Sequence, residues 1–349
     1  MVVIPRVLLP ISEPAAKGFL FFAYPLSILG NNERTYPWIM SNFIQVCFDK
    51  DFKNSPVPFT FYSYDFSVSP WLKHEKIFRN TLQDISADIV TLIKACINNG
   101  KYVHLYLDER YVVNRRAYQK FSFIHENFIY GYDDDISAFH ILGFDQNGQY
   151  VSSVLTYKQL LSAYQGVGDI IAANEFHQEL HPASIDIFNT IQIFELNLAV
   201  EYSFNKQLVL STLKEYLNGD NTSNWFAMLR EPWDRVYGME CYSYIQKYYE
   251  LLLKEEAGYD IRYLHNLWEH KQLMTKRVQY MKEQGHTELG EGEVEEFRNL
   301  EQELFGLRNA MIKYSLTNQK TLIEHIYFKL PEMAQLEQSL IEKWIKHSE

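Results

Sequence analysis

The pattern of hydrophobic residues changes near position 205, and this change divides the chain into two parts of different kind. Before it, residues 101–108 alternate between apolar and polar positions and are rich in β-forming residues, and residues 123–133 and 138–145 flank a polar turn as the strands of a hairpin do. Beyond it, apolar residues recur at spacings of three and four, most regularly from Phe297 to Tyr314. A chain of 349 residues is also longer than a usual single domain. The sequence therefore predicts an α+β domain with an antiparallel sheet at 1–205, followed by an α-helical domain at 206–349.

Two of these strands are predicted to form a hairpin that places a histidine opposite a carboxylate. The strands flank a polar turn at 134–137. If the turn is centred near Asp135, His125 and Asp145 are equally far from it and face each other on one side of the sheet. A carboxylate beside an imidazole fixes the tautomer of the ring and stabilises its charged form, as a general base in acyl transfer requires. From geometry alone, a structural ion pair explains this facing equally well.

The N-terminal segment supplies one thiol of interest, that of Cys47. Residues 17–24 are predicted to form a buried strand, and Pro37 is predicted to open a helix that carries Cys47 near its far end. A thiolate gains most from a helix N-terminus, so Cys47 is poorly placed for a lowered pKa and fits a small buried hydrophobic residue. Cys241 has no histidine or other base near it in the sequence.

A second group of polar residues lies in the helical half. Arg262, His265, Glu269 and His270 fall within nine residues, and His265 and Glu269 share one helix face. His270 points about 100° away from Glu269, so the group matches no firm zinc motif. A latch against the N-terminal half, a substrate anchor and a metal site are all compatible with it. Ordinary salt bridging is the simplest interpretation.

Composition and motifs limit the partners of the chain. A formal charge of −11 argues against nucleic acid or an anionic membrane as the main partner, and it fits a cationic substrate such as an amine. Three widely spaced cysteines indicate neither a disulfide framework nor a zinc site. The glycine-rich phosphate loops are absent from the sequence, so no cofactor is expected. No charged and apolar leader and no membrane span is evident, so a cytoplasmic location is expected.

The run HENFIYGYDDD, followed by AFHILGFD, resembles the histidine-containing hairpin of papain-like proteins, especially the N-terminal domain of the butirosin biosynthesis protein H family. YVVNRRAYQK, LSAY and DIRYLHNLWEHKQLM are also similar to relatives of that family found beside nonribosomal peptide pathways. The resemblance implies a papain-like fold and a role in secondary metabolism. It further implies transfer of an acyl, aminoacyl or peptidyl group from a carrier-protein thioester to an amine or to water. His125 and Asp145 match the histidine and aspartate of the family hairpin, so they are expected to be catalytic.

The chain departs from the family pattern at the nucleophile. The family places a catalytic cysteine near the start of its first long helix, where this chain reads PLSILGNNERTYPWIMSNFIQVC. Ser27 is nearest to the expected place, and a Ser/His/Asp triad with His125 and Asp145 is chemically sound. If there is no nucleophile, His125 could instead deprotonate an amine for direct aminolysis.

A non-catalytic protein is the alternative from another class. Such a protein would keep the papain-like scaffold as an accessory or binding module of a peptide synthetase pathway, and the missing cysteine supports this. The resemblance implies an acylated carrier protein or a peptide synthetase as partner. The apolar stripe from Phe297 to Tyr314 is compatible with a homodimer seam, although packing within the chain explains it more simply.

Overall fold

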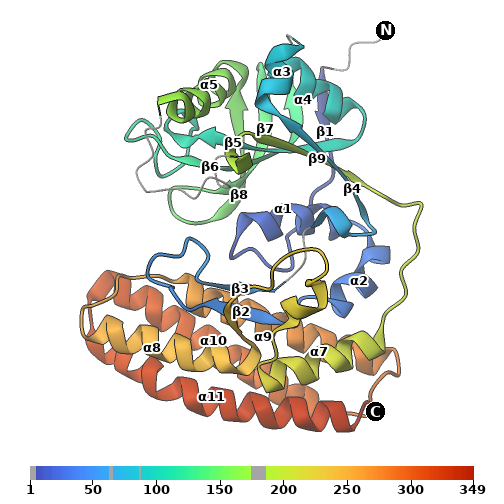
Figure 1. Ribbon diagram of the computed structural model, residues 1–349, viewed down its shortest axis with the longest axis vertical. Helices are drawn as coiled ribbons and strands as arrows, with labels where there is room; N and C mark the ends of the chain where they lie inside the picture. The colour runs from blue at the N-terminus through green and yellow to red at the C-terminus, as the bar shows by residue number, and fades with distance from the viewer. Residues whose placement is uncertain (1–4, 63–65, 86–87, 174–185) are drawn as a thin grey trace. The chain divides into compact units, whose positions relative to one another are not determined.

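The computed structural model describes residues 5–62, 66–85, 88–173 and 186–349 (Figure 1). The chain forms two compact units, and each is described by itself. Unit 1 comprises Met1–Glu33 and Asp65–Glu201, and unit 2 comprises Arg34–Tyr64 and Tyr202–Glu349. The sequence predicted a single boundary at 205/206, whereas the structure also assigns residues 34–64 to the unit that contains the C-terminal helices.

Unit 1 is built on a seven-stranded sheet in which every pairing is antiparallel. The strand order is β4-β9-β5-β6-β7-β8, and β1 pairs with β6. This agrees with the predicted α+β class with an antiparallel sheet. The elements of unit 1 are β1 (Arg6–Leu8), α1 (Leu20–Leu29), η2 (Phe66–Val68), β4 (Leu72–Phe78), α3 (Arg79–Asp84), α4 (Ile89–Asn98), β5 (Lys101–Asp108), η3 (Glu109–Tyr111), β6 (Ile124–Asp133), β7 (Ala138–Phe144), β8 (Tyr150–Thr156), α5 (Tyr157–Ala173) and β9 (Thr190–Leu196).

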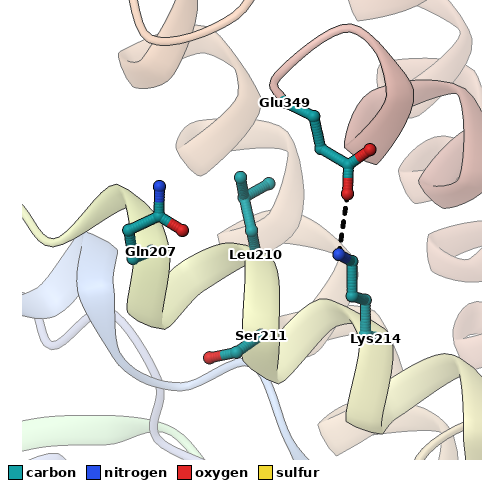
Figure 2. A pocket seen from close by; sticks show the side chains of 5 residues that line it. All are labelled: Gln207, Leu210, Ser211, Lys214 and Glu349. Atoms are coloured by element: carbon teal, nitrogen blue, oxygen red, sulfur yellow. Dashed lines mark hydrogen bonds and ion pairs between the residues drawn. The ribbon is translucent and has the colours of Figure 1, made fainter.

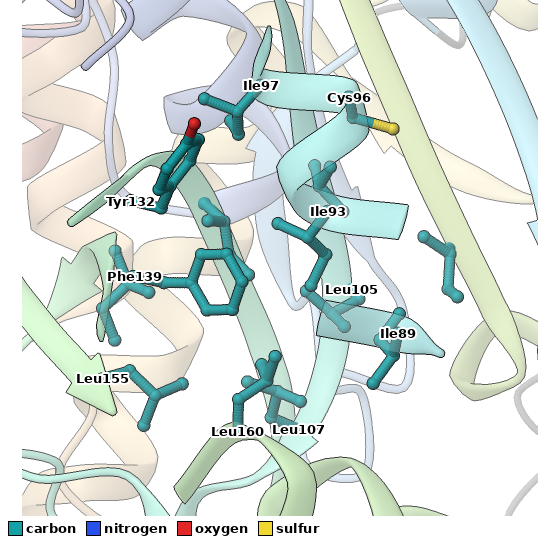
Figure 3. Close-up of a cluster of buried hydrophobic side chains, with 14 of the residues drawn as sticks. Ile89, Ile93, Cys96, Ile97, Leu105, Leu107, Tyr132, Phe139, Leu155 and Leu160 are labelled. Atoms are coloured by element: carbon teal, nitrogen blue, oxygen red, sulfur yellow. The ribbon is translucent and has the colours of Figure 1, made fainter. Parts of the chain in front are cut away.

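One face of this sheet carries the hydrophobic core of unit 1, against which α4 and α5 pack (Figures 1 and 3). Helix α4 begins at Ile89, and the carboxylate of the N-cap residue Asp88 accepts the Thr91 N–H. Its buried residues, Ile89, Ile93, Cys96 and Ile97, recur at the spacings of three and four that place side chains on one helix face. Alternate strand residues such as Leu105 and Leu107 meet this face, because successive side chains of a strand point to opposite sides. The clustered residues include Ile89, Ile93, Ile97, Val103, Leu105, Leu107, Ile129, Ile141, Leu155 and Leu160.

The opposite face of the sheet is aromatic and polar, and α1 covers it. Tyr24 of α1 stacks on Phe128 with ring centroids 4.9 Å apart, and it meets His104 at 5.4 Å. The prediction of a strand at 17–24 is wrong, since this segment enters a helix at Leu20. The physical reason is that nearly every residue of α1 is buried, so the apolar run has no periodicity that distinguishes a helix from a strand.

The predicted hairpin is confirmed as β6 and β7. Phe128 pairs with Leu142 and Ile129 pairs with Ile141, which is the register of a turn centred on Asp135. The register then shifts by one residue between Ile129 and Gly131, in a β-bulge. The bulge lies nearer the turn than the Phe128–Leu142 and Ile129–Ile141 pairs, so it does not alter the register on the side toward His125.

Unit 2 combines a small sheet with a set of helices, in agreement with the predicted helical C-terminal region. Strand β2 pairs with β3 and with β10, which lies almost 190 residues later in the chain, and this pairing brings residues 34–64 into unit 2. The elements are η1 (Glu33–Thr35), α2 (Tyr36–Ser41), β2 (Val46–Asp49), β3 (Phe59–Phe61), α7 (Lys206–Asn218), η4 (Thr222–Phe226), β10 (Arg235–Tyr237), η5 (Gly238–Glu240), α8 (Cys241–Leu253), α9 (Arg262–Glu283), α10 (Glu291–Thr317) and α11 (Lys320–Lys346). In the described ranges, no helix has the length and apolar character needed to cross a membrane.

A buried polar network joins the helices of unit 2. The ammonium group of Lys271 on α9 donates to Glu337 Oε1 at 2.5 Å, His270 Nδ1 at 2.8 Å and the Tyr216 hydroxyl at 3.1 Å. Tyr242 donates to the other oxygen of Glu337 at 2.7 Å. All three donors of the ammonium group are therefore satisfied, which is what a charge in the protein interior requires.

We expect Lys271→Met to lower the free energy of unfolding by about 3–5 kcal/mol, because it leaves the Glu337 carboxylate buried without its counter-ion. Lys276→Met is the matched control, since Lys276 lies on the same helix and is exposed. Its effect should stay within about 0.5 kcal/mol. Urea unfolding followed by the helical circular dichroism signal measures both variants. Equal midpoints for the two would contradict a stabilising role of the network.

Candidate active site

His125, at the start of β6, is hydrogen-bonded to a carboxylate, and that carboxylate belongs to Glu109. The distance from His125 Nδ1 to Glu109 Oε1 is 3.1 Å. A carboxylate only accepts hydrogen bonds, so Nδ1 carries the proton and Nε2 keeps the lone pair in the neutral ring. Glu109 is buried, whereas the His125 side chain is 35% exposed. No described residue hydrogen-bonds Nε2, and this pair is called the Glu109–His125 dyad below.

Arg115 is a buried cation beside the dyad. Its Nε lies 3.6 Å from Glu109 Oε1, and its two terminal nitrogens donate to the carbonyl oxygens of Phe144 at 2.7 Å and Leu142 at 3.4 Å. Gly143, between those carbonyls, has a φ of 152°, and a Cβ there would lie 2.7 Å from the guanidinium. Glycine therefore provides both the backbone conformation and the space for Arg115. The result is a guanidinium fixed to β7 that lies within ion-pair distance of Glu109.

The charges around His125 favour its protonated form. Burial by itself lowers the pKa of the ring, but the hydrogen bond and the negative charge of Glu109 outweigh burial and raise the pKa above its usual value. Glu126 acts in the same direction, and Arg115 acts against it. The dyad therefore stabilises an imidazolium, which is the form that a general base reaches after it has taken a proton.

Asp145 is engaged elsewhere, although it was predicted to orient His125. Strand β7 ends at Phe144, and the Asp145 carboxylate accepts the backbone N–H groups of Asn147 and Gln149, each at 2.8 Å, in the turn to β8. These backbone hydrogen bonds, that of Gln149 above all, lower the pKa of Asp145. The hairpin register was read correctly, but the ladder stops before it reaches His125. The carboxylate at His125 comes instead from the residue after β5.

Ser27, the predicted nucleophile, is not brought to the dyad by any described contact. It lies inside α1 and is fully buried. Its hydroxyl is 3.1 Å from the hydroxyl of Tyr150, and burial raises the pKa of that tyrosine. Among the described residues, no base that could activate Ser27 is hydrogen-bonded to it.

The three cysteines are buried and unreactive by environment. Cys47 lies on β2 and not at the end of a helix as predicted, and burial raises the pKa of its thiol to about 11 despite Arg235 nearby. Burial also raises the pKa of Cys96, and it raises that of Cys241 further. Reactive cysteines have the opposite character, with a lowered pKa and an accessible sulfur.

A second histidine–glutamate pair lies on the other face of the sheet, and sequence reasoning missed it. His104 Nε2 is 3.5 Å from Glu126 Oε1, and His104 Nδ1 accepts the side-chain amide of Gln192 at 3.1 Å. The Tyr106 hydroxyl donates to Glu126 at 3.3 Å. Burial raises the pKa of Glu126, but the contacts with His104 outweigh burial and lower it. Because His104 is buried under α1, this pair is closed to substrate, whereas the Glu109–His125 dyad is open.

The polar group predicted at 262–270 is divided between two environments. His265 pairs with Glu269 at 3.1 Å and accepts a hydrogen bond from Arg308, as expected for residues on one helix face. His270 lies inside unit 2, where its Nε2 donates to the Ile44 carbonyl, and burial followed by the charge of Lys271 lowers its pKa. Within the described ranges, no group of His, Cys, Asp or Glu residues could hold a metal ion.

Two surface cavities are lined by described residues of unit 2, and neither contains the dyad. One, of about 380 Å³, lies beside α7, where Lys214 pairs with Glu349 at 2.7 Å (Figure 2). Ser211 in its wall donates its hydroxyl proton to the Leu208 carbonyl, so it has no activating base. The other, of about 290 Å³, is lined by residues of α9 together with Tyr36 and Arg298. Neither arrangement assembles a nucleophile and a base.

No protein-family model matches this chain, and no curated protein matches it. The resemblance to the butirosin biosynthesis protein H family, and the papain-like form of the fold, therefore remain expectations from the sequence.

We expect Glu109→Gln to lower the pKa of His125, because the variant removes the negative charge that outweighs the effect of burial. Asp145→Asn should leave this pKa nearly unchanged, since its carboxylate binds backbone N–H groups of its own turn. An NMR titration of the His125 ring signals measures both variants, and wild type should titrate above 6.5. A larger change in the pKa of His125 in Asp145→Asn than in Glu109→Gln would contradict this and would favour Asp145, which the hairpin symmetry predicted, as the partner of His125.

Proposed function

We propose that this chain is an acyltransferase-like enzyme of secondary metabolism in which the Glu109–His125 dyad acts as the general base. The observation that carries the proposal is the hydrogen bond from His125 Nδ1 to a buried carboxylate, with Nε2 left without a partner among the described residues. The resemblance to the butirosin biosynthesis protein H family supports a carrier-protein thioester as the acyl donor. An amine-bearing small molecule or water is the acceptor, and the acidic charge of the chain fits the amine.

The chemistry proceeds without a covalent enzyme intermediate. His125 Nε2 removes a proton from the attacking amine as its nitrogen forms a bond to the thioester carbonyl carbon. The carbon–sulfur bond then breaks, and the imidazolium returns the proton to the leaving thiolate. The products are an amide and a free thiol, and the enzyme is unchanged. Glu109 stabilises the imidazolium between the two proton transfers, and Arg115 holds Glu109.

A non-catalytic accessory or binding protein of a peptide synthetase pathway is the second candidate. The burial of Ser27 and of all three cysteines favours it, because none of these groups can act as the nucleophile of a papain-like enzyme. The two candidates differ in what they require of His125. An enzyme needs its lone pair for proton transfer, whereas a binding module does not.

The test is thiol release from acyl-pantetheine thioesters in the presence of primary amines. We expect amine-dependent release by wild type and a loss of about 10²- to 10⁴-fold in His125→Ala, which is the usual contribution of a general base. The rate should rise with pH as His125 loses its proton, and Glu109→Gln should move this rise to lower pH. His325→Ala, an exposed histidine on α11, is the matched control and should behave as wild type.

The protein mass should stay unchanged during this reaction, since no acyl-enzyme forms. A stable acyl adduct that disappears in Ser27→Ala would contradict direct aminolysis. Equal thiol release by wild type and His125→Ala would remove the base from the mechanism and favour the binding module.

A further inference from the structure

Two exposed phenylalanines continue the ring of His125 into a row. Phe123 stacks on His125 with ring centroids 5.1 Å apart and planes 23° apart, and Phe121 meets Phe123 edge-on at 6.4 Å. The three residues are two positions apart, which places their side chains on one side of an extended chain. Phe121 is 46% exposed and Phe123 is 44% exposed. Phe121, Phe123 and His125 are called the aromatic row.

The exposed rings stand on a fixed backbone. The Phe123 N–H donates to Asp108 Oδ1 at 3.0 Å, and the Phe123 carbonyl accepts the Glu109 N–H at 2.8 Å. Asp108 is itself fully buried, and its Oδ1 also accepts the Arg110 N–H. The backbone of Phe123 is therefore hydrogen-bonded to Glu109 of the dyad and to Asp108, its neighbour in sequence. The segment that places Glu109 beside His125 thus also positions the ring of Phe123.

We propose that the aromatic row binds the apolar part of the acyl group, and that it favours an aromatic acyl group such as phenylacetyl. This inference rests on the proposed function, because it assigns a substrate class to the same site. Single exposed apolar residues need no explanation, but here one exposed ring stacks on the partly exposed imidazole of the dyad and the other contacts that ring. A substrate ring placed on Phe123 covers apolar surface of both partners and gains aromatic packing.

Distance explains why a short acyl group would not use the row. The centroid of Phe123 lies 5.1 Å from that of His125. If the carbonyl carbon of an acetyl group lies at the imidazole, its single methyl carbon is too short to reach across to the ring of Phe123. A phenylacetyl group places its own ring there. Transfer remains the same exchange, in which the amine nitrogen replaces the thioester sulfur on the carbonyl carbon and the proton passes through His125 to the thiolate.

The experiment compares phenylacetyl-pantetheine with acetyl-pantetheine as donors to one primary amine. We expect wild type to favour the phenylacetyl donor in kcat/KM by about tenfold, which corresponds to the upper range for an aromatic pair. Phe123→Ala should remove most of this preference through KM, Phe121→Ala should remove part of it, and Phe123→Leu should keep some of it. Phe78→Ala is the control, because Phe78 is also 46% exposed and lies at the end of the edge strand β4. It should keep the wild-type preference.

Binding of phenylacetamide separates failure of the inference from failure of the proposed function. This neutral amide does not react, and we expect it to shift the His125 NMR signals of wild type and to have little effect in Phe123→Ala. If neither donor is turned over but phenylacetamide binds in this way, the row is a binding site and the proposed acyl transfer is wrong. If both donors are turned over with equal kcat/KM, or if Phe78→Ala loses the preference as Phe123→Ala does, the inference is wrong.

Discussion

The pairing of β5 with β6 is the constraint on which the candidate site depends. It sets Leu107 opposite His125 and Asp108 opposite Ile124, so the residue after β5, Glu109, arrives beside the imidazole. The register is fixed by the core, because Leu105, Leu107 and Ile129 must all lie on the face against α4 and α5. A slip of one residue would move these side chains to the opposite face and would separate the dyad. Hydrophobic packing therefore determines the position of a polar pair.

The same sheet carries two histidine–glutamate pairs, and the environment gives them different roles. His104 and Glu126 lie under α1, where the Gln192 amide donates to His104 and the Tyr106 hydroxyl donates to Glu126. Such a pair is enclosed, so it contributes to the structure of that face. The Glu109–His125 dyad has the same chemical groups, but it lies where β5 ends and β6 begins, and there Glu109 is buried and His125 is partly exposed. The proposed acyl transfer requires that asymmetry, with a fixed carboxylate behind a ring that a substrate could reach.

The sequence predicted what depends on local pattern and missed what depends on distant pairing. The β6–β7 hairpin and the stripe from Phe297 to Met311, whose apolar residues are buried in unit 2, were predicted because a short turn or one helix determines each. Helix α1 was missed because its residues are apolar on every side. The partner of His125 was missed because residues 109–123 separate β5 from β6, and a connection of that length sets no register. Likewise, no local signal joins β2 to β10.

The choice between a covalent and a direct mechanism follows from which groups the fold leaves accessible. Ser27, Cys47 and Cys241 are fully enclosed, and the pKa values of both thiols are raised by burial. A covalent route would have to expose one of them, and each contributes to the packing of a helix or a strand. The dyad needs no such change, since its base already lies at the surface of unit 1. Under the proposed acyl transfer, an acceptor that brings its own nucleophilic nitrogen is therefore the reactant that suits this arrangement. The acidic charge of the chain favours the approach of the amine in its protonated form, which must lose one proton to solvent before it attacks.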